Sequence, residues 1–345
     1  MDWPYLLACL LLPLLASLGL TFLLLVVLRG IGLYDRPNER SLHDTPTPRG
    51  GGLAPAAVLV AGIATVAGPE GLPPVAWLPP LGGALLLAAT GWRDDRAGLS
   101  PLAKLLPQLV AVGLGMVALS SGGLTFQGWL PDVLDRPVAA LLWLWFVNLY
   151  NFMDGSDGLA GTMTVAGFSA YAIAAWIGGS GGASIFLALV AATLPFLWYN
   201  KPPARIFLGD VGAVPLGFLA AVFGMEGWQA GAWAAWFPLL VFLPFIADAT
   251  ATLGRRLWSG ARVWEAHREH HYQRLVQLGF GHRGTLALYA CLMVTASLSA
   301  VAMLAWKPTA GVLLLAGWVA AFALLFVGIG YHWRRRKLGF NESKN

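Results

Sequence analysis

Apolar runs of about 20 residues recur along the whole chain, and they restrict the possible fold more than any other feature. A helix needs about that length to cross the hydrocarbon core of a bilayer. The runs are rich in Leu, Ala, Val, Gly and Trp, and they lack the ten-residue alternation of an outer-membrane barrel. With 57% hydrophobic residues, 11% charged residues and a mean hydropathy of +0.67, the chain is typical of an all-α, polytopic membrane bundle.

About eleven membrane spans are expected, the second and eighth of them short and rich in glycine. The first run has no basic segment before it and no clear cleavage site, which favours a retained span over a signal peptide. No repeat or linker divides the chain, so residues 1–345 are predicted to form a single domain. The predicted spans are residues 4–28, 53–68, 77–92, 102–120, 137–153, 158–177, 183–199, 211–225, 233–253, 285–305 and 310–332.

The basic residues predict that the N-terminus lies outside and the C-terminus in the cytoplasm. In that orientation the inner loops, with Lys104 at the start of its helix, hold all but two of the 22 Lys and Arg residues. Arg136 and Lys307 are the two that remain outside. This bias is the one that the positive-inside rule requires. The net charge of +5 therefore indicates topology and contact with anionic membrane lipid, and no nucleic acid is expected as a partner.

Nearly every unusual polar residue falls in five segments that this orientation places on the inner side. Five separated segments at one membrane face predict one site built from loops and helix ends. The segments are SLHDTPTPRGGG (41–52), GWRDDRAGLSPLAK (91–104), NLYNFMDGSDGLAG (148–161), NKPPARIFLGDVGAVPLG (200–217) and EAHREHHYQRLVQLGFGHR (265–283).

The central segment carries Asn148, Asn151, Asp154 and Asp157 at three-residue spacing. On a continuous helix each step of three turns the side chain by about 300°, so the first and last could not share a face. The glycines of DGSDG predict a helix break that turns the acids back toward one protein-walled cavity. The alternative is a polar loop in which Asp157 caps the next helix. That alternative does not explain two amides in the last turns before the loop.

Three further acids have two interpretations each. Asp94 and Asp95 are either solvated partners of the flanking arginines or a pair that binds a divalent cation. Asp210 stands where a loop enters a helix, so it is either a cap or a neighbour of a helix N-terminus that suits an anion such as phosphate. Phe207 is either an interfacial anchor or a stacking face for a base.

Four of the six histidines lie in the last inner loop, namely His267, His270, His271 and His282, together with several arginines such as Arg268. Zinc normally requires cysteine or a third defined ligand, and no such set is evident. A cationic loop rich in hydrogen-bond donors fits a diphosphate with Mg²⁺ better. The positive-inside rule explains the arginines but not the histidines.

Together these motifs resemble the polyprenyl-phosphate N-acetylhexosamine-1-phosphate transferases. This family includes the enzyme that makes the first lipid intermediate of peptidoglycan and those that initiate O-antigen and teichoic-acid carriers. The resemblance covers most of the chain, with the motifs in the family's order. The family's first inner loop is matched by SLHDTPTPRGGG, its acid-pair motif by DD with SPLAKLLPQ, its central motif by NLYNFMDGSDGLAG and its GD motif by RIFLGDVGAVPLG. AHREHHYQ departs from the three consecutive histidines of the peptidoglycan enzyme and is closer to the O-antigen branch.

The resemblance implies roles for individual residues. Asp210 matches the Mg²⁺ ligand of the family, Phe207 the residue near the uracil, and residues 267–271 the loop that contacts the diphosphate. The residues implied for catalysis are Asp94, Asp95, Asp154, His270 and His271; those for substrate binding are Asn148, Asn151, Asp157, Phe207, His267, Arg268 and Lys104; those for metal ligation are Asp210 and Asp154.

The implied reaction joins a UDP-N-acetylhexosamine to undecaprenyl phosphate and releases UMP, with Mg²⁺ as cofactor and Mn²⁺ as an alternative. It would take place at the cytoplasmic face of a bacterial inner membrane. Direct attack and a covalent aspartyl intermediate stay open, as do the sugar, the glycan that is initiated and the oligomeric state, a homodimer included. A cation-coupled transporter is the alternative function, although it predicts acids near the midplane and inverted repeats. Asp248 either pairs with Arg255 or Arg256 or contacts the nucleotide.

Overall fold

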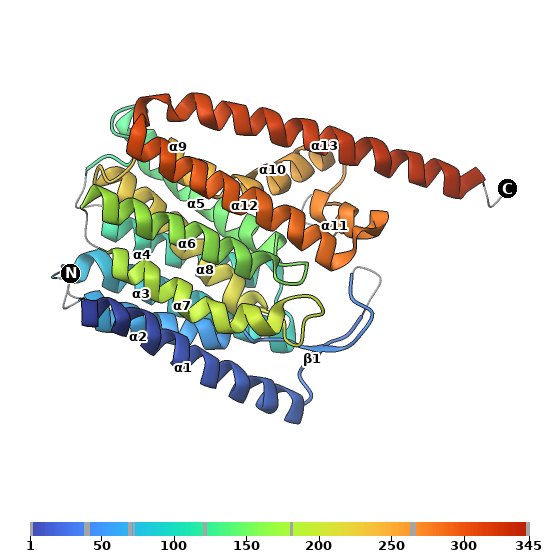
Figure 1. The fold of residues 1–345 in the computed structure, drawn as a ribbon, viewed down its shortest axis with the longest axis horizontal. Helices are drawn as coiled ribbons and strands as arrows, with labels where there is room; N and C mark the ends of the chain where they lie inside the picture. The colour runs from blue at the N-terminus through green and yellow to red at the C-terminus, as the bar shows by residue number, and fades with distance from the viewer. Residues whose placement is uncertain are drawn as a thin grey trace.

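Long helices that run back and forth across one bundle make up nearly all of the structure (Figure 1). The computed structural model describes residues 3–37, 42–67, 71, 73–119, 123–179, 182–262 and 267–342. Its elements are α1 (Trp3–Gly30), β1 (Tyr34–Asp35), β2 (Thr47–Pro48), α2 (Leu53–Ala67), α3 (Pro74–Ala97), α4 (Pro101–Leu119), α5 (Asp132–Phe152), α6 (Leu159–Gly178), α7 (Ala183–Asn200), α8 (Asp210–Gln229), α9 (Trp236–Val241), α10 (Leu243–Trp258), α11 (His271–Leu275), η2 (Val276–Phe280), α12 (Gly281–Trp306), η3 (Pro308–Ala310) and α13 (Gly311–Glu342).

The prediction of an all-α, polytopic membrane bundle is confirmed. In the described part of the chain, nine helices are long and apolar enough to cross a membrane, and they coincide with nine of the predicted spans. The two other predicted spans are shorter elements. Residues 53–68 contain α2, which has 15 residues, and residues 233–253 are divided at Phe242 between α9 and α10. The eighth span, expected to be short, is the full 20-residue α8.

The core of the bundle is formed by α6, α7 and α8. In the most apolar window of α8, 78% of the residues are buried, against 17% in α1 and in α13. These two peripheral helices lie at opposite edges of the bundle in Figure 1. Small residues let α8 approach its neighbours α3 and α5 closely. The position of α8 at the centre matters because its first residue is one of the predicted site residues.

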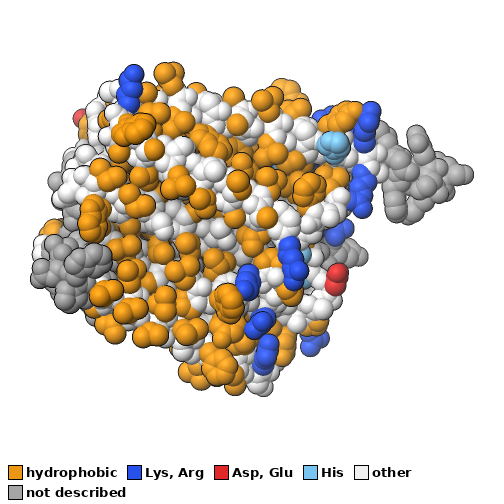
Figure 2. Space-filling model, in the orientation of Figure 1, with side chains coloured by type: hydrophobic (Ala, Val, Ile, Leu, Met, Phe, Trp, Pro, Cys, Tyr) orange, Lys and Arg blue, Asp and Glu red, His pale blue; other side chains and the backbone are white. Residues whose placement is uncertain are grey.

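The described residues of all five predicted polar segments lie at one end of the bundle. There α3 and α5 end, α4, α6 and α8 begin, and β1 pairs with β2 (Figure 1). On the face drawn in Figure 2, most of the Lys and Arg side chains also lie toward this end. The alternating helix directions therefore agree with the loop assignment read from the sequence. The orientation across a membrane stays a prediction.

The first inner loop is fixed to the start of α8 by backbone pairing. The N–H of Phe207 donates to the carbonyl of Pro48 at 2.8 Å. In return, Gly51 donates to the carbonyl of Phe207, and Gly52 to that of Leu208, both at 2.9 Å. Two loops that are distant in sequence thus form one platform in front of α8.

Gly52 allows this contact because its Cα lies against the backbone of Gly212, where a Cβ would overlap. We expect Gly52→Ala to destabilise the protein by about 1–3 kcal/mol, since the platform would have to move away from α8. Gly113 of α4 is the matched control, because a Cβ there meets no atom. Thermal unfolding in detergent should show a lower Tm for Gly52→Ala than for Gly113→Ala, and equal values would contradict the close approach.

Candidate active site

A cluster of three carboxylates joins the end of α3 to the start of α8. Asp94, Asp95 and Asp210 each place a carboxylate oxygen within 4.8 Å of the others. Lys104 Nζ lies 2.5 Å from Asp94 Oδ2 and 3.2 Å from Asp210 Oδ2. Arg49 binds the other two acids, with Nε 2.7 Å from Asp95 Oδ1 and Nη2 3.1 Å from Asp210 Oδ1. Two cations thus face three acids, which leaves an excess negative charge at the cluster.

The two members of the acid pair have different environments. Both oxygens of Asp95 accept backbone N–H groups at the start of α8, from Asp210 at 3.1 Å and Val211 at 3.2 Å, and its side chain is 0% exposed. Asp95 therefore caps α8, a role that the sequence had offered to Asp210. Asp94 accepts the N–H of Leu99 at 2.6 Å and lines a cavity. The pair divides into one structural acid and one accessible acid.

The central segment breaks its helix as predicted, since α5 ends at Phe152 and α6 begins at Leu159. The break brings Asn151 Nδ2 to 3.4 Å from Asp210 Oδ2. Asp154 lines a cavity together with these two residues. Burial raises the pKa of Asp154 well above its ordinary value, and the carboxylate of Asp210 raises it further. A cation bound among these acids would stabilise their ionised form and so lower the pKa of Asp154 again.

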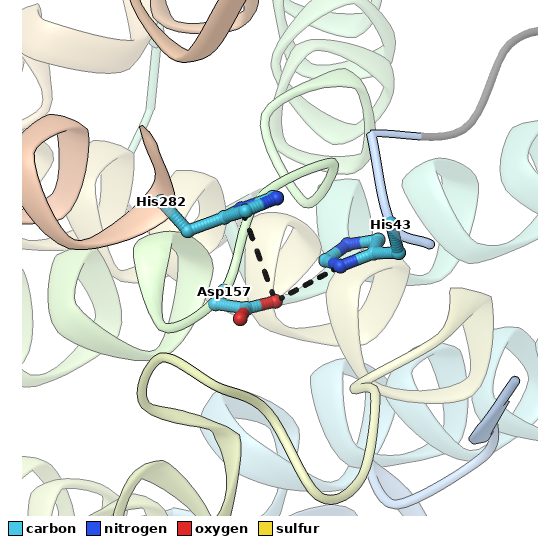
Figure 3. Close-up of side chains that lie close together, drawn as sticks. All are labelled: His43, Asp157 and His282. Carbon is cyan, nitrogen blue, oxygen red and sulfur yellow. Dashed lines mark ion pairs between the residues drawn. The ribbon is translucent and has the colours of Figure 1, made fainter. Parts of the chain in front are cut away.

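Asp157 takes no part in capping α6, whose N-cap is Gly158 without a side-chain hydrogen bond. Its Oδ2 accepts the N–H of Ala204 at 2.9 Å, and its Oδ1 lies 3.4 Å from His43 Nδ1 and 4.0 Å from His282 Nδ1 (Figure 3). These side chains come from the first inner loop, the central loop and α12. Asp157 thus holds three segments together at the edge of the site.

The cluster of His43, Asp157 and His282 has metal-ligand residue types, but its geometry does not suit a metal. The two imidazoles are nearly parallel, at 15° with centroids 4.5 Å apart, so their in-plane lone pairs cannot converge on one ion. His282 Nδ1 is also engaged by Ser156 Oγ at 2.9 Å. Burial lowers the pKa of His43 below its ordinary value, although Asp157 opposes this shift. A neutral His43 at pH 7 therefore lies against Phe207, with ring centroids 4.4 Å apart.

Two cavities meet at the carboxylate cluster. The first, here called the loop cavity, has a volume of about 310 Å³ and contains residues from the first inner loop, the central loop, the loop before α8 and α11. The second, the helix cavity, has a volume of about 530 Å³ and extends between α3, α4, α5 and α8. The walls of the loop cavity include Asp35, His43, Arg49, Asp154, Asn200 and Phe207; those of the helix cavity include Leu87, Asp94, Lys104, Leu105, Gln108, Asn148, Val214, His267 and His270; the residues shared by both are Asn151, Phe152, Asp210 and Gln273.

The histidine loop contributes differently from each position. His267 and His270 line the helix cavity with stacked rings, 4.9 Å between centroids. Burial and the neighbouring His270 lower the pKa of His267 to about 4, so it is neutral at pH 7. His271 lies instead between Asp248 and Phe326, with its ring 3.9 Å from the phenyl ring. His271 therefore lines neither of the two described cavities.

Most of the residues that the sequence singled out reach one of the two cavities. Those that do so are Asp94, Lys104, Asn148, Asn151, Asp154, Phe207, Asp210, His267 and His270; those that lie outside the described cavity walls are Asp95, Asp157, Arg268 and His271.

The sequence interpretation assigned no role to Arg49 or His43. Arg49 is the only Lys or Arg of SLHDTPTPRGGG and stands directly before glycines that allow close packing, and this was the available signal. The carboxylate cluster offers oxygen donors only, which is the donor type that Mg²⁺ and Mn²⁺ prefer. The residues present therefore fit a divalent cation.

We expect the two acids of the pair to differ in their effect on stability. Asp95→Asn weakens the cap of α8 and leaves Arg49 without its shortest contact, which should lower the free energy of unfolding by about 3–5 kcal/mol. Asp94→Asn should lower it less, because this substitution also removes the repulsion between residue 94 and Asp210. Thermal unfolding of the two purified variants in detergent tests this difference. A Tm that falls equally in both would contradict it.

Comparisons with known proteins agree with this site. Residues 77–227, which contain the acid pair, the central segment and the GD motif, match the family model described as glycosyl transferase family 4. A probable undecaprenyl-phosphate N-acetylglucosaminyl 1-phosphate transferase from Bacillus subtilis (strain 168) is 31% identical over 290 residues, covering 79% of this chain and 78% of that protein. The undecaprenyl-phosphate alpha-N-acetylglucosaminyl 1-phosphate transferase of Escherichia coli (strain K12) is 29% identical over 300 residues, 81% of this chain and 78% of its own.

The decaprenyl-phosphate N-acetylglucosaminephosphotransferase of Mycobacterium tuberculosis (strain ATCC 25618 / H37Rv) is 29% identical over 337 residues, covering 86% of this chain and 82% of that protein. Each of these three similarities covers more than three quarters of this chain. The chain therefore belongs to glycosyl transferase family 4, among the polyprenyl-phosphate N-acetylhexosamine-1-phosphate transferases that its motifs resemble.

Proposed function

We propose that the protein transfers N-acetylhexosamine 1-phosphate from a UDP-sugar to undecaprenyl phosphate and releases UMP. The observation that carries this proposal is the meeting of two cavities at Asn151 and Asp210, beside the carboxylate cluster. A transfer between a soluble donor and a lipid acceptor needs two approaches to one reacting centre. The names of the relatives support the polyprenyl phosphate acceptor and the sugar phosphate group.

The loop cavity suits the UDP-sugar. It is formed by loops at one end of the bundle, which water-soluble molecules can reach, and its volume of about 310 Å³ lies in the usual range for a ligand pocket. Phe207 offers a flat face for a base, and neutral His43 packs against its ring. Arg49 also lines this cavity and can donate to a phosphate.

The helix cavity suits undecaprenyl phosphate. Leu87, Leu105 and Val214 supply apolar contacts for the first isoprene units, and they belong to membrane-spanning helices. Lys104 and His270 lie in the same cavity and can bind the phosphate. An amphipathic cavity of this kind matches an acceptor with one anionic end and one apolar chain.

Asp94 is the better candidate for the general base. It lines the helix cavity, where its carboxylate can take a proton from the acceptor phosphate, whereas Asp95 is engaged by α8 and Arg49. The acceptor oxygen would then form a bond to the sugar-bearing phosphorus of the donor as the bond to UMP breaks. Attack at phosphorus leaves the anomeric configuration of the sugar unchanged. A covalent aspartyl route would instead release a burst of UMP without acceptor.

Asp210, with Asp94 and Asp154 nearby, would hold Mg²⁺, for which Mn²⁺ is an alternative. The ion would screen the two anionic substrates and stabilise the charge of the phosphoryl-transfer transition state. Asn151 orients Asp210 through its amide, and Lys104 neutralises part of the cluster. The acids lie at one end of the bundle, which removes the main support for a transporter with ion sites near the midplane.

The cellular setting follows from the same features. Inner loops rich in Lys and Arg support a site at the cytoplasmic face of a bacterial inner membrane, where UDP-sugars are available. The histidine loop supports a role in initiating O-antigen or a similar lipid-linked glycan. Because both cavities combine helices from across the chain, residues 1–345 act as one domain in this proposal.

The direct test is transfer of labelled sugar phosphate from a panel of UDP-N-acetylhexosamines to undecaprenyl phosphate by purified protein. We expect lipid product and UMP with Mg²⁺ and none with a chelator. Asp210→Asn should lower kcat by about a thousandfold, since it removes several kcal/mol of charge stabilisation. Asp132→Asn, at the exposed start of α5, is the control and should keep native activity. No product from folded native protein with any donor would refute the proposal.

The two cavities should respond separately to substitution. Lys104→Gln removes a charged donor from the helix cavity and should raise KM for the lipid acceptor about tenfold, as expected for one charge-assisted hydrogen bond. Phe207→Leu should raise KM for the UDP-sugar, through the loop cavity, while KM for the acceptor stays near native. Steady-state kinetics with one substrate varied at a time gives both constants. Equal changes for both substrates would show that the cavities are assigned wrongly.

A further inference from the structure

We infer that Asp248 is a positioning residue: its carboxylate fixes the start of α11 so that His270 is held at the wall of the helix cavity. This inference rests on the proposed function, because it concerns how the acceptor phosphate is bound. Asp248 itself lines neither of the described cavities. It acts on the substrate through another side chain.

Asp248 gathers donors from three helices onto one fully buried carboxylate. It accepts the backbone N–H of His271 at 2.7 Å and that of Tyr272 at 2.9 Å, both at the start of α11. The hydroxyl of Tyr289 on α12 donates to it at 2.5 Å, and that of Thr252 on α10 at 3.2 Å. These contacts tie α10, α11 and α12 together behind the histidine loop.

The same carboxylate also faces two imidazoles. His271 Nδ1 lies 3.2 Å from Asp248 Oδ1, and the ring is stacked on Phe326 of α13. His270 Nδ1 lies 3.7 Å from the same oxygen, while the ring lines the helix cavity. This second contact is longer than a hydrogen bond. Asp248 therefore sets the place of His270 through the backbone N–H groups of His271 and Tyr272, the two residues that follow it.

The five-residue α11 passes through η2 into α12 with a kink at Gly279, and a single turn beyond a kink has little helical stability of its own. Its position depends on tertiary contacts, and Asp248 supplies those at its first turn. If residue 248 served only to pack these helices together, an apolar side chain would do so without the free-energy cost of burying a carboxylate. The sequence left open an ion pair of Asp248 with Arg255 or Arg256, but both arginines pair with Glu269.

Asp135 of α5 provides a matched control. It is also 0% exposed, and it also accepts two backbone N–H groups, from Thr125 and Phe126, both at 2.8 Å. It stands at the end of α5 that is opposite the central loop. Asp135→Asn therefore perturbs a carboxylate of the same kind far from either cavity.

The test is a double-mutant cycle between Asp248→Asn and His270→Gln, measured as affinity for a short-chain prenyl phosphate by intrinsic tryptophan fluorescence. A binding measurement on the full-length protein needs no turnover. We expect Asp248→Asn to weaken binding about tenfold, as the loss of a supporting side chain typically does. In the His270→Gln background the same substitution should change affinity less than about twofold, because the residue through which it acts is gone.

Asp135→Asn should lower Tm but leave the affinity near native in both backgrounds. Tyr289→Phe, which removes one hydrogen bond to Asp248 and keeps the carboxylate, should weaken binding in the same direction by a smaller factor. It replaces Asp248→Asn in the cycle if that variant does not fold.

Equal effects with and without His270, or an equal loss of affinity in Asp135→Asn, would overturn the positioning role and leave Asp248 with a packing role. Native protein that binds no prenyl phosphate would overturn the proposed acceptor instead. The two failures are therefore distinguishable.

Discussion

The mutual repulsion of carboxylates at one end of the bundle is the constraint that the other features of the site satisfy. Asp94, Asp95 and Asp210 are close enough to destabilise one another, and Arg49 and Lys104 offset only part of that charge. Holding these groups together requires the end of α3, the start of α4 and the start of α8 to meet. It also requires the first inner loop to lie on the α8 platform, since Arg49 reaches the cluster from there.

The helices could be predicted from the sequence because a bilayer imposes one length on every span. Nine predicted spans have a matching helix in the described residues. The division of residues 233–253 at Phe242 could not be predicted, because hydropathy does not change where α9 passes into α10. The helix break after Phe152 was predictable, since there the spacing of polar residues conflicts with a continuous helical face.

The site could be predicted by residue type but not by partner. Asp94 and Asp95 are equivalent in the sequence, and only the start of α8 distinguishes them by capturing Asp95. His270 and His271 are likewise equivalent in the sequence, and only the structure distinguishes them, because Phe326 stacks on the ring of His271. Arg49 was overlooked because its role depends on acids that lie far away along the chain. Contacts of this kind arise from tertiary packing, and no local pattern encodes them.

The number of backbone donors separates supporting carboxylates from reactive ones. A carboxylate has about four lone-pair sites, so two backbone N–H groups and a side-chain donor leave little capacity for a ligand. Asp95 and Asp248 each accept two backbone N–H groups and line neither described cavity. Asp94 accepts one, and the Asp210 carboxylate is held by the side chains of Arg49, Lys104 and Asn151, which a substrate or cation can displace. The acids with free capacity are those at the junction of the two cavities, where the proposed transfer needs them.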